Sequence, residues 1–336
     1  MNWNEGYTAK YYLTIVDPLT FQDVETYSLI SGTIKREGAD LMHSADLVSP
    51  DYSETSEKIV RVWLDAAQDG GSSHTPLFTG YTATPEINIT YQRQRKSLQC
   101  YSVLKPAQDI LLDRGWYAPV DIDGAVLVKQ LLKVTNSPVE ISEKTDRKRK
   151  LTNAIIAESG ETNLSMAWKI LDAMNWRLRI DGYGRIFVEP YSKEETAIFD
   201  TISNDIIEPS ITIQYDWYDC PNVLRVVVGD DVFISKDMSD KEMSIPSRGR
   251  EIWTEETSPA LNDRETGQDY ADRRLKELQR VSKLLSYDRR FDPDIYPTDI
   301  VYISLPRFEI EGQYFISSQT IELGFHAKTS EEVYKL

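Results

Sequence analysis

The sequence changes character within one stretch, KSLQCYSVLKPAQDILLDR at residues 96–114. Its first part, Ser97–Val103, is rich in residues that favour strands and closes a series of short β segments. Pro106 then stands where a helix can begin, because proline is tolerated in the first helical turn. The stretch therefore predicts that a β-rich domain ends near residue 110 and that a unit with helices follows.

Residues 1–110 consist of short runs rich in Val, Ile, Thr and Tyr, several of which alternate with a period of two. Turn-forming clusters such as Asp69–Ser73 separate these runs, and strands at this spacing are typical of a sandwich or a barrel. The runs are Lys10–Asp17, Tyr27–Ile34, Lys58–Asp65, Leu77–Thr82, Glu86–Tyr91 and Ser97–Val103. We expect residues 1–110 to form a first β-barrel-like domain.

Residues 111–200 are predicted to form a small α/β module. Apolar residues recur at helical spacing in Asp123–Val134 and again from Asn163 to Asn175. Two short strand-like runs follow on either side of residues 181–184, where glycines permit the positive φ of a tight turn.

Residues 201–336 return to strand-like runs and are predicted to form a second β-barrel-like domain with an inserted helix at about 262–286. Asn262 and Glu265 resemble a capping box, and Leu275, Leu278 and Leu285 follow a narrow apolar stripe. We expect this helix to pack on the second sheet or against another subunit. The predicted fold class is α+β and β-rich, with two small β-barrel-like domains separated by a small α/β module and one long helix in the C-terminal part.

The charge of the chain is strongly negative, with 38 Lys+Arg against 54 Asp+Glu and a formal net charge of −16. Residues 1–110 carry 9 basic and 14 acidic residues (−5), residues 111–200 carry 13 and 14 (−1), and residues 201–336 carry 16 and 26 (−10). The two β-rich segments hold nearly all the surplus. Such a surface repels phosphate backbones, which disfavours sequence-specific nucleic-acid binding.

Targeting signals are not recognisable in this sequence. No run approaches the roughly 18 uninterrupted apolar residues of a membrane span. The start, MNWNEGYTAK, lacks the basic and apolar regions of a signal peptide. We therefore expect no membrane segment, no signal peptide and synthesis in a cytoplasm.

Common catalytic motifs are absent, since the sequence contains no HExxH, GxSxG, P-loop or GxGxxG pattern. Cys100 and Cys220 belong to no metal-binding cluster, which favours buried free thiols. His43, His74 and His326 are isolated in sequence and are interpreted as surface or packing histidines. No catalytic, cofactor-binding or metal site is predicted, and the chain is expected not to be an enzyme.

Two local charged clusters have both a binding and a structural interpretation. Asp121–Gly124 resembles the start of a calcium loop, but Leu132 stands where an EF-hand needs a glutamate, so a turn before a helix is favoured. Arg147–Lys150 has the charge to contact phosphates or an acidic partner, but Glu143 and Asp146 adjoin it, so a solvated loop is favoured.

Candidate interface residues come from two places in the C-terminal segment. Tyr215, Trp217 and Tyr218 supply rigid aromatic area beside acidic groups, a combination enriched in the cores of protein interfaces. Sugar stacking is the alternative use of the same side chains. Leu275 and Leu278 on the predicted helix complete the set.

The order of these elements resembles the central baseplate hub family of contractile phage tails, phage-tail-like bacteriocins (tailocins) and prophage particles. The resemblance covers essentially the whole chain, although each motif is degenerate. Its motifs are YYLTIVD at 11–17 with SLISGTIKRE at 28–37, LFTGYTATPEINIT at 77–90 with KSLQCYSVLKPAQDILLDR at 96–114, SGETNLSMAWKILDAMNWRLRIDGYGRIFVEPY at 159–191, DCPNVLRVVVGDD at 219–231, DYADRRLKELQRVSKLLSYD at 269–288, PTDIVYISLP at 297–306 and GQYFISSQTIEL at 312–323.

The resemblance implies a structural role without a cofactor, located in the baseplate of a virion or tail-like particle. It implies a homotrimer in which each chain supplies two barrel-like domains, so that three chains form a six-part ring with a central channel. The implied partners are the hexameric tail tube protein, the trimeric spike protein and other baseplate proteins. The negative charge suits a channel through which DNA passes as cargo without adhering.

Three other functions compete with this expectation. The same module begins the larger tail-tip and tail-associated lysin proteins of non-contractile phages, although the end of this sequence at Leu336 favours the contractile type. An acidic cell-wall-degrading hydrolase would need two carboxylates facing each other across a cleft. A glycan-binding module would use the tyrosine-rich strands.

Overall fold

The structure is a computed structural model, and it confirms an α+β, β-rich chain with 49% strand and 17% helix. It describes residues 2–3, 5–90, 93–143, 149–191, 194–200, 206–215, 217–218, 220–257, 259, 265–280, 283–324 and 327–336. Within the parts of the chain that are described, no helix combines the length and the apolar character needed to cross a membrane.

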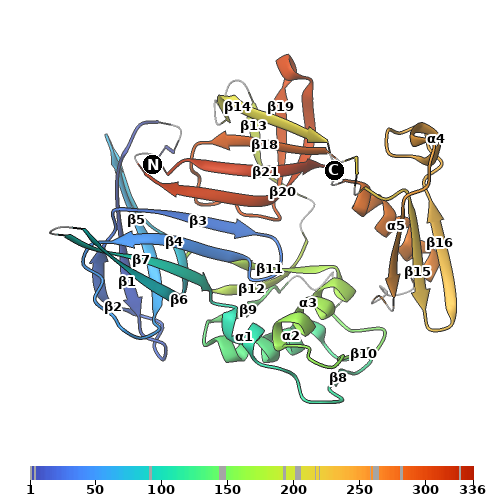
Figure 1. The fold of residues 1–336 in the computed structure, drawn as a ribbon, viewed down its shortest axis with the longest axis horizontal. Helices are drawn as coiled ribbons and strands as arrows, with labels where there is room; N and C mark the ends of the chain where they lie inside the picture. The colour runs from blue at the N-terminus through green and yellow to red at the C-terminus, as the bar shows by residue number, and fades with distance from the viewer. Residues whose placement is uncertain are drawn as a thin grey trace.

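A 13-stranded sheet with two arms forms most of the molecule (Figure 1). The N-terminal arm has the strand order β3-β4-β7-β6-β5-β1-β2, and the C-terminal arm has the order β14-β18-β21-β20-β19-β13. The N-terminal strands are β1 (Thr8–Val16), β2 (Asp23–Ser28), β3 (Ser31–Glu37), β4 (His43–Ser49), β5 (Ile59–Gln68), β6 (Gly71–Thr90) and β7 (Arg93–Ser102). The C-terminal strands are β13 (Glu195–Asp200), β14 (Ile206–Tyr215), β18 (Lys283–Arg289), β19 (Ile300–Leu305), β20 (Ile310–Leu323) and β21 (Thr329–Lys335).

Strand β20 joins the two arms because it pairs with a different strand along each half of one edge. Ile310–Phe315 pair with β19, whereas Ser318–Leu323 pair antiparallel with β3. The sequence predicts two closed or nearly closed sheets, but the described strands of the two arms form one continuous 13-stranded sheet with no closed barrel. The length of β20 explains the difference, since 14 residues are enough to pair with two neighbours in succession.

Two strand predictions in the N-terminal arm need correction. The predicted run Tyr27–Ile34 is divided between β2 and β3. The run Leu77–Thr82 and residues 86–90 of the run Glu86–Tyr91 belong to one strand, β6, in spite of Pro85 between them, and Tyr91 lies outside the described residues. Strand β5 pairs with β6 only as far as Tyr81, so the missing N–H of Pro85 breaks no ladder on that side.

The small α/β module lies beside both arms, and its predicted helices and hairpin are confirmed (Figure 1). Asp123 caps the N-terminus of α2 by accepting a hydrogen bond from Val126 N, so Asp121–Gly124 is the turn before a helix. The elements are α1 (Lys105–Asp109), β8 (Tyr117–Ala118), α2 (Gly124–Leu132), a 3₁₀ turn (Lys133–Thr135), β9 (Val139–Ile141), β10 (Ile155–Ile156), α3 (Asn163–Met174), β11 (Trp176–Ile180) and β12 (Ile186–Pro190).

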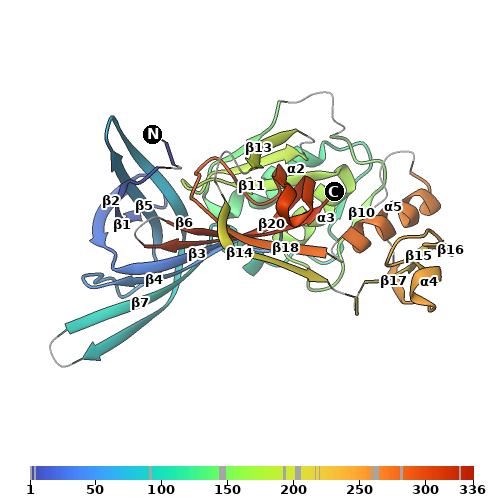
Figure 2. The same ribbon diagram turned by 90° about the horizontal axis from the view of Figure 1, so that it is seen from above.

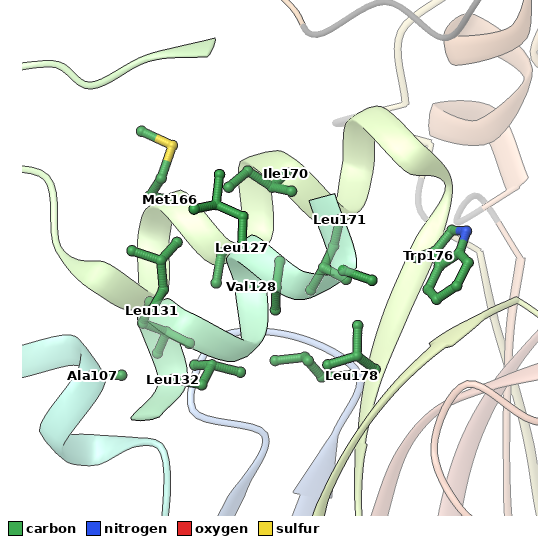
Figure 3. Packing of buried hydrophobic residues seen from close by; sticks show 14 of the residues in the cluster. Ala107, Leu127, Val128, Leu131, Leu132, Met166, Ile170, Leu171, Trp176 and Leu178 are labelled. Carbon is green, nitrogen blue, oxygen red and sulfur yellow. The ribbon is translucent and has the colours of Figure 1, made fainter. Parts of the chain in front are cut away.

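The core of the module lies where α2 and α3 meet the β11–β12 hairpin (Figure 3). Leu127 and Leu131 of α2 pack with Ile170 and Leu171 of α3, and Leu178 of the hairpin closes the cluster. Burial of these side chains stabilises the module by roughly 1.5–3 kcal/mol each.

A smaller unit, which we call the satellite, consists of β15 (Val223–Val228), β16 (Asp231–Lys236), β17 (Trp253–Thr257), α4 (Ile245–Arg248) and α5 (Gly267–Arg280). It stands at one end of the long axis of the molecule (Figure 1). The predicted helix at 262–286 is shorter than expected, because Lys283–Arg289 form strand β18. Leu285, Tyr287 and Arg289 are buried with a period of two, which is strand periodicity. Asn262 of the predicted capping box lies outside the described residues.

Candidate assembly surfaces and the buried seam

A row of buried polar side chains crosses the seam where the two arms of the sheet join. Cross-strand neighbours in this row are His43 on β4, Arg36 on β3, Gln319 on β20, Glu331 on β21 and Tyr287 on β18. All five are almost completely buried. Because neighbouring residues on one face of a sheet lie within contact distance, the row links five strands from both arms.

Glu331 is the centre of this row. Its carboxylate accepts hydrogen bonds from Arg289 Nη2 at 2.7 Å, Tyr287 Oη at 2.8 Å and Gln319 Nε2 at 2.6 Å. Burial raises the pKa of Tyr287 well above its usual value, and the charge of Glu331 raises this pKa further. The Arg289–Glu331 ion pair is therefore a fully desolvated, hydrogen-bonded pair rather than a surface salt bridge.

Arg36 and His43 occupy the N-terminal side of the seam. Arg36 Nη2 donates to the carbonyl oxygen of Leu77 at 2.7 Å, and its guanidinium lies 4.8 Å from the ring centroid of Tyr296. Burial lowers the pKa of His43 well below 6.5, and the nearby charge of Arg36 lowers it further. His43 is thus a neutral packing histidine.

The β11–β12 hairpin of the module binds both arms close to this seam. Arg177 Nη1 donates to the carbonyl oxygen and the hydroxyl of Thr298 at 2.7 and 2.6 Å, and it contacts Asp299 at 3.2 Å. On the other side, the hydroxyl of Thr79 donates to the carbonyl oxygen of Gly182 at 2.7 Å. A Cβ at Gly182 would lie 1.8 Å from the carbonyl oxygen of Pro76, so only glycine fits this contact. The module therefore holds the arms in a fixed arrangement.

The predicted aromatic interface residues lie together at the junction of β14 with the satellite. Tyr215, Trp217 and Tyr218 are 45%, 61% and 82% exposed, and the rings of Tyr215 and Trp217 are 6.0 Å apart. Arg248 of α4 donates to the carbonyl oxygens of Trp217 and Cys220, which fixes the backbone there. The adjoining hollow of about 720 Å³ is lined by Trp217, Tyr218, Asp240, Glu242, Met243, Ser247, Arg248 and Arg250.

The predicted leucines lie elsewhere, on α5. Leu275 is buried with Leu224 and Val226 in the core of the satellite, and Leu278 is partly buried against the same cluster. The structure therefore places Leu275 and Leu278 against the three-stranded sheet of the satellite and apart from the aromatic group.

The remaining candidates of the sequence have structural environments. His74 stacks on Trp63 with centroids 4.1 Å apart and contacts Asp65 at 2.6 Å. Arg149 of the basic run forms an ion pair with Asp123 at 2.8 Å, whereas Arg147 and Lys148 lie outside the described residues. His326 also lies outside them. Cys100 and Cys220 are both buried thiols that form no disulfide.

Carboxylates line a crevice of about 450 Å³ between the module and the C-terminal arm. Two of its three aspartates are already paired, Asp181 with Arg185 at 2.6 Å and Asp299 with Arg177 at 3.2 Å. In the described part of the chain, no three histidine, cysteine or acidic side chains form a group that could hold a metal ion. The Arg177–Asp299 pair joins the module to the C-terminal arm, and the Asp181–Arg185 pair lies within the hairpin turn of the module.

The seam was missed by sequence reasoning, although one signal for it exists. Arg36 follows Ile34 by two residues in a strand, so period-two alternation places both on the same buried face. Its acidic counterpart, Glu331, lies almost 300 positions away, and only the β3–β20 pairing brings the two regions together.

Comparison with solved structures shows that this fold is shared with tail proteins. A tail protein from Neisseria meningitidis MC58 aligns over 98% of this chain and 97% of its own, with a TM-score of 0.69 and 15% identity. The 43 kDa tail protein of prophage MuSo2 from Shewanella oneidensis aligns over the same shares, with a TM-score of 0.70 and 12% identity. A chain of the Francisella PdpA-VgrG complex covers all of this chain and matches it over 53% of its own length, with a TM-score of 0.58 and 6% identity.

Sequence comparison adds no relative to this picture. No protein-family model matches the chain, and no curated protein matches it. At 6–15% identity, what these structures share with this chain is the fold.

Proposed function

We propose that this chain is a structural protein of a phage tail or tail-like particle and acts as its baseplate hub. The observation that carries the proposal is the match of nearly the whole chain to nearly the whole of two tail proteins. The exposed aromatic residues Tyr215, Trp217 and Tyr218, together with a module that Arg177 binds to the C-terminal arm, also support an assembly role.

In the finer form of the proposal, three chains close into a ring around a central channel in a contractile tail. Each chain contributes two β arms, so three copies supply the six similar parts that a hexameric tail tube requires. The trimeric spike and other baseplate proteins are the further proposed partners, and DNA passes through the channel without adhering to the acidic chain. The division at residues 110 and 200 and the aromatic interface residues Tyr215, Trp217 and Tyr218 belong to the same proposal.

The second candidate is the related module of a non-contractile tail tip. The Francisella match supports this candidate, because in that protein the fold occupies about half of a longer chain. A hydrolase that uses acidic residues is the less favoured function, since arginines already pair with two of the three aspartates of the crevice.

The experiment that tests the proposal is mass photometry of the purified chain at micromolar concentration, alone and with a tail tube protein. If the chain is a hub, we expect it to form trimers that bind the tail tube protein. Monomers in both conditions, together with cell-wall hydrolysis by the purified chain, would contradict it.

A further inference from the structure

Four buried side-chain atoms at the seam have no hydrogen-bond partner among the described residues. They are His43 Nδ1, Arg36 Nε, Gln319 Oε1 and Arg289 Nε, and the four side chains are between 1% and 4% exposed. Only three other side-chain atoms in the described residues share this property, so such atoms are concentrated at the seam. The strands that carry them lie side by side, from β4 and β3 in the N-terminal arm to β20, β21 and β18 in the C-terminal arm (Figure 2).

Two of these atoms belong to neighbouring side chains. Arg36 and Gln319 stand directly opposite each other in the β3–β20 ladder. The amide group of Gln319 is fixed in orientation, because Nε2 donates to Glu331 at 2.6 Å and to the carbonyl oxygen of Ile295 at 3.0 Å. Its Oε1 is therefore an acceptor that needs a donor. Directly opposed side chains have Cβ atoms about 4.5–5.5 Å apart, so one small ligand can reach both Arg36 Nε and Gln319 Oε1.

The chemistry of these atoms selects a ligand that donates and accepts hydrogen bonds at once. Arg36 Nε can only donate, and Gln319 Oε1 can only accept. Neutral His43 stands opposite Arg36 on β4, and its Nδ1 needs a donor or an acceptor according to its tautomer. An anion cannot donate to Gln319, and a cation is repelled by the guanidinium groups of Arg36 and Arg289. Water meets all of these requirements.

We propose that an ordered water molecule binds in the seam, where it accepts a hydrogen bond from Arg36 Nε and donates one to Gln319 Oε1. His43 Nδ1 extends the site towards β4. Buried water in proteins typically makes about three hydrogen bonds to polar groups that otherwise lack a partner. Because the two arms pair through β3 and β20, this water is part of the joint between them. The inference concerns a single chain and does not depend on the proposed function.

The crevice of about 450 Å³ offers solvent a route to this part of the seam. Tyr296 lines the crevice, and its ring centroid lies 4.8 Å from the guanidinium of Arg36. Ile295, the residue before it, supplies the carbonyl oxygen that holds Gln319. We therefore expect water to enter by a small movement of these two residues, without separation of the arms.

The first test counts long-lived water molecules by magnetic relaxation dispersion of the water oxygen nucleus on the purified full chain. Gln319→Met removes the acceptor and keeps the length of the side chain. The matched control, Gln313→Met, makes the same change at an exposed position of the same strand. We expect Gln319→Met to lower the number of long-lived waters by about one and Gln313→Met to leave it unchanged. Equal numbers in the two folded variants, with folding checked by circular dichroism, would overturn the proposal.

The second test needs no substitution, so it decides the proposal even if Gln319→Met fails to fold. It is a crystal structure of the unmodified chain, grown with bromide, at a resolution that shows ordered water. We expect a water molecule about 2.7–3.2 Å from both Arg36 Nε and Gln319 Oε1. A direct bond between these two atoms, or an anomalous bromide peak beside Arg36, would overturn it. Neither test measures assembly, so a negative result leaves the proposed function untouched.

Discussion

Glu331→Ala is the substitution that most directly tests the seam. It removes the carboxylate that accepts hydrogen bonds from Arg289, Tyr287 and Gln319, while those three donors stay buried. Breaking one partner of a buried ion pair typically costs about 3–5 kcal/mol, because the other charge is left uncompensated. We expect Glu331→Ala to lower the free energy of unfolding by about that amount, since losses within one network are not additive.

The assay is urea unfolding at pH 7, followed by tryptophan fluorescence. Glu322→Ala is the matched control: Glu322 lies on the adjacent strand β20, its side chain is exposed, and it contacts Lys328 at 3.7 Å. An exposed pair of this kind contributes about 0–1 kcal/mol. Combining Glu331→Leu with Arg289→Met replaces both charges by apolar groups and should recover most of the loss. A loss below about 1 kcal/mol for Glu331→Ala would refute the central position of the carboxylate.

Three further predictions concern other contacts. The folded chain keeps His43 neutral, while in the unfolded chain this histidine binds a proton below about pH 6.5. The free energy of unfolding should therefore fall by up to about 1.4 kcal/mol per pH unit as the pH drops below that value. If the free energy of unfolding of His43→Leu depends on pH with the same slope as that of the unmodified chain, this prediction is contradicted. Gly182→Ala should lower the free energy of unfolding in urea by about 1–3 kcal/mol because its Cβ meets the Pro76 carbonyl, whereas Gly6→Ala, whose Cβ meets nothing within 4 Å, should cost far less. Equal unfolding midpoints would argue against the close contact between the hairpin of the module and β6. Leu275→Ala should lower the stability of the satellite by about 2–5 kcal/mol, which would be measured as faster amide hydrogen exchange in β15 and β16. Unchanged exchange would show that α5 does not stabilise the satellite.

Local patterns in the sequence predicted the helical module well. The apolar spacing of Asn163–Asn175, the turn at residues 181–184 and the turn before a helix at Asp121–Gly124 are all decided by neighbours within a few positions, and the structure confirms each of them. Predictions of this kind succeed because the interactions that decide them are short in range.

Long-range pairing accounts for most of the differences. Nothing near Ser318–Leu323 in the sequence indicates that these residues pair with β3, about 285 positions earlier, so the joining of the two arms was not predicted. The extension of the inserted helix to residue 286 was wrong because the apolar residues Leu275, Leu278 and Leu285 also fit a helical stripe. Leu285 is instead placed by its partner Val333 in β21.

The candidate site was predictable only in part. The exposed aromatic group at Tyr215, Trp217 and Tyr218 is visible in the sequence as a cluster, and the structure places it at the surface beside the satellite. The buried row at the seam has no local cluster, because its residues come from five strands. Charged residues in a strand are ordinarily assigned to the solvent face, and only tertiary pairing shows that these are internal.

The measurement that tests the central claim most directly is electron microscopy of the purified full chain, alone and with the tail tube protein. The account predicts particles with threefold symmetry around an open axial hole, which sit coaxially on one end of the tube. Particles that remain single compact molecules in both preparations, with no ring and no tube end occupied, would contradict the assignment of this chain to a baseplate hub.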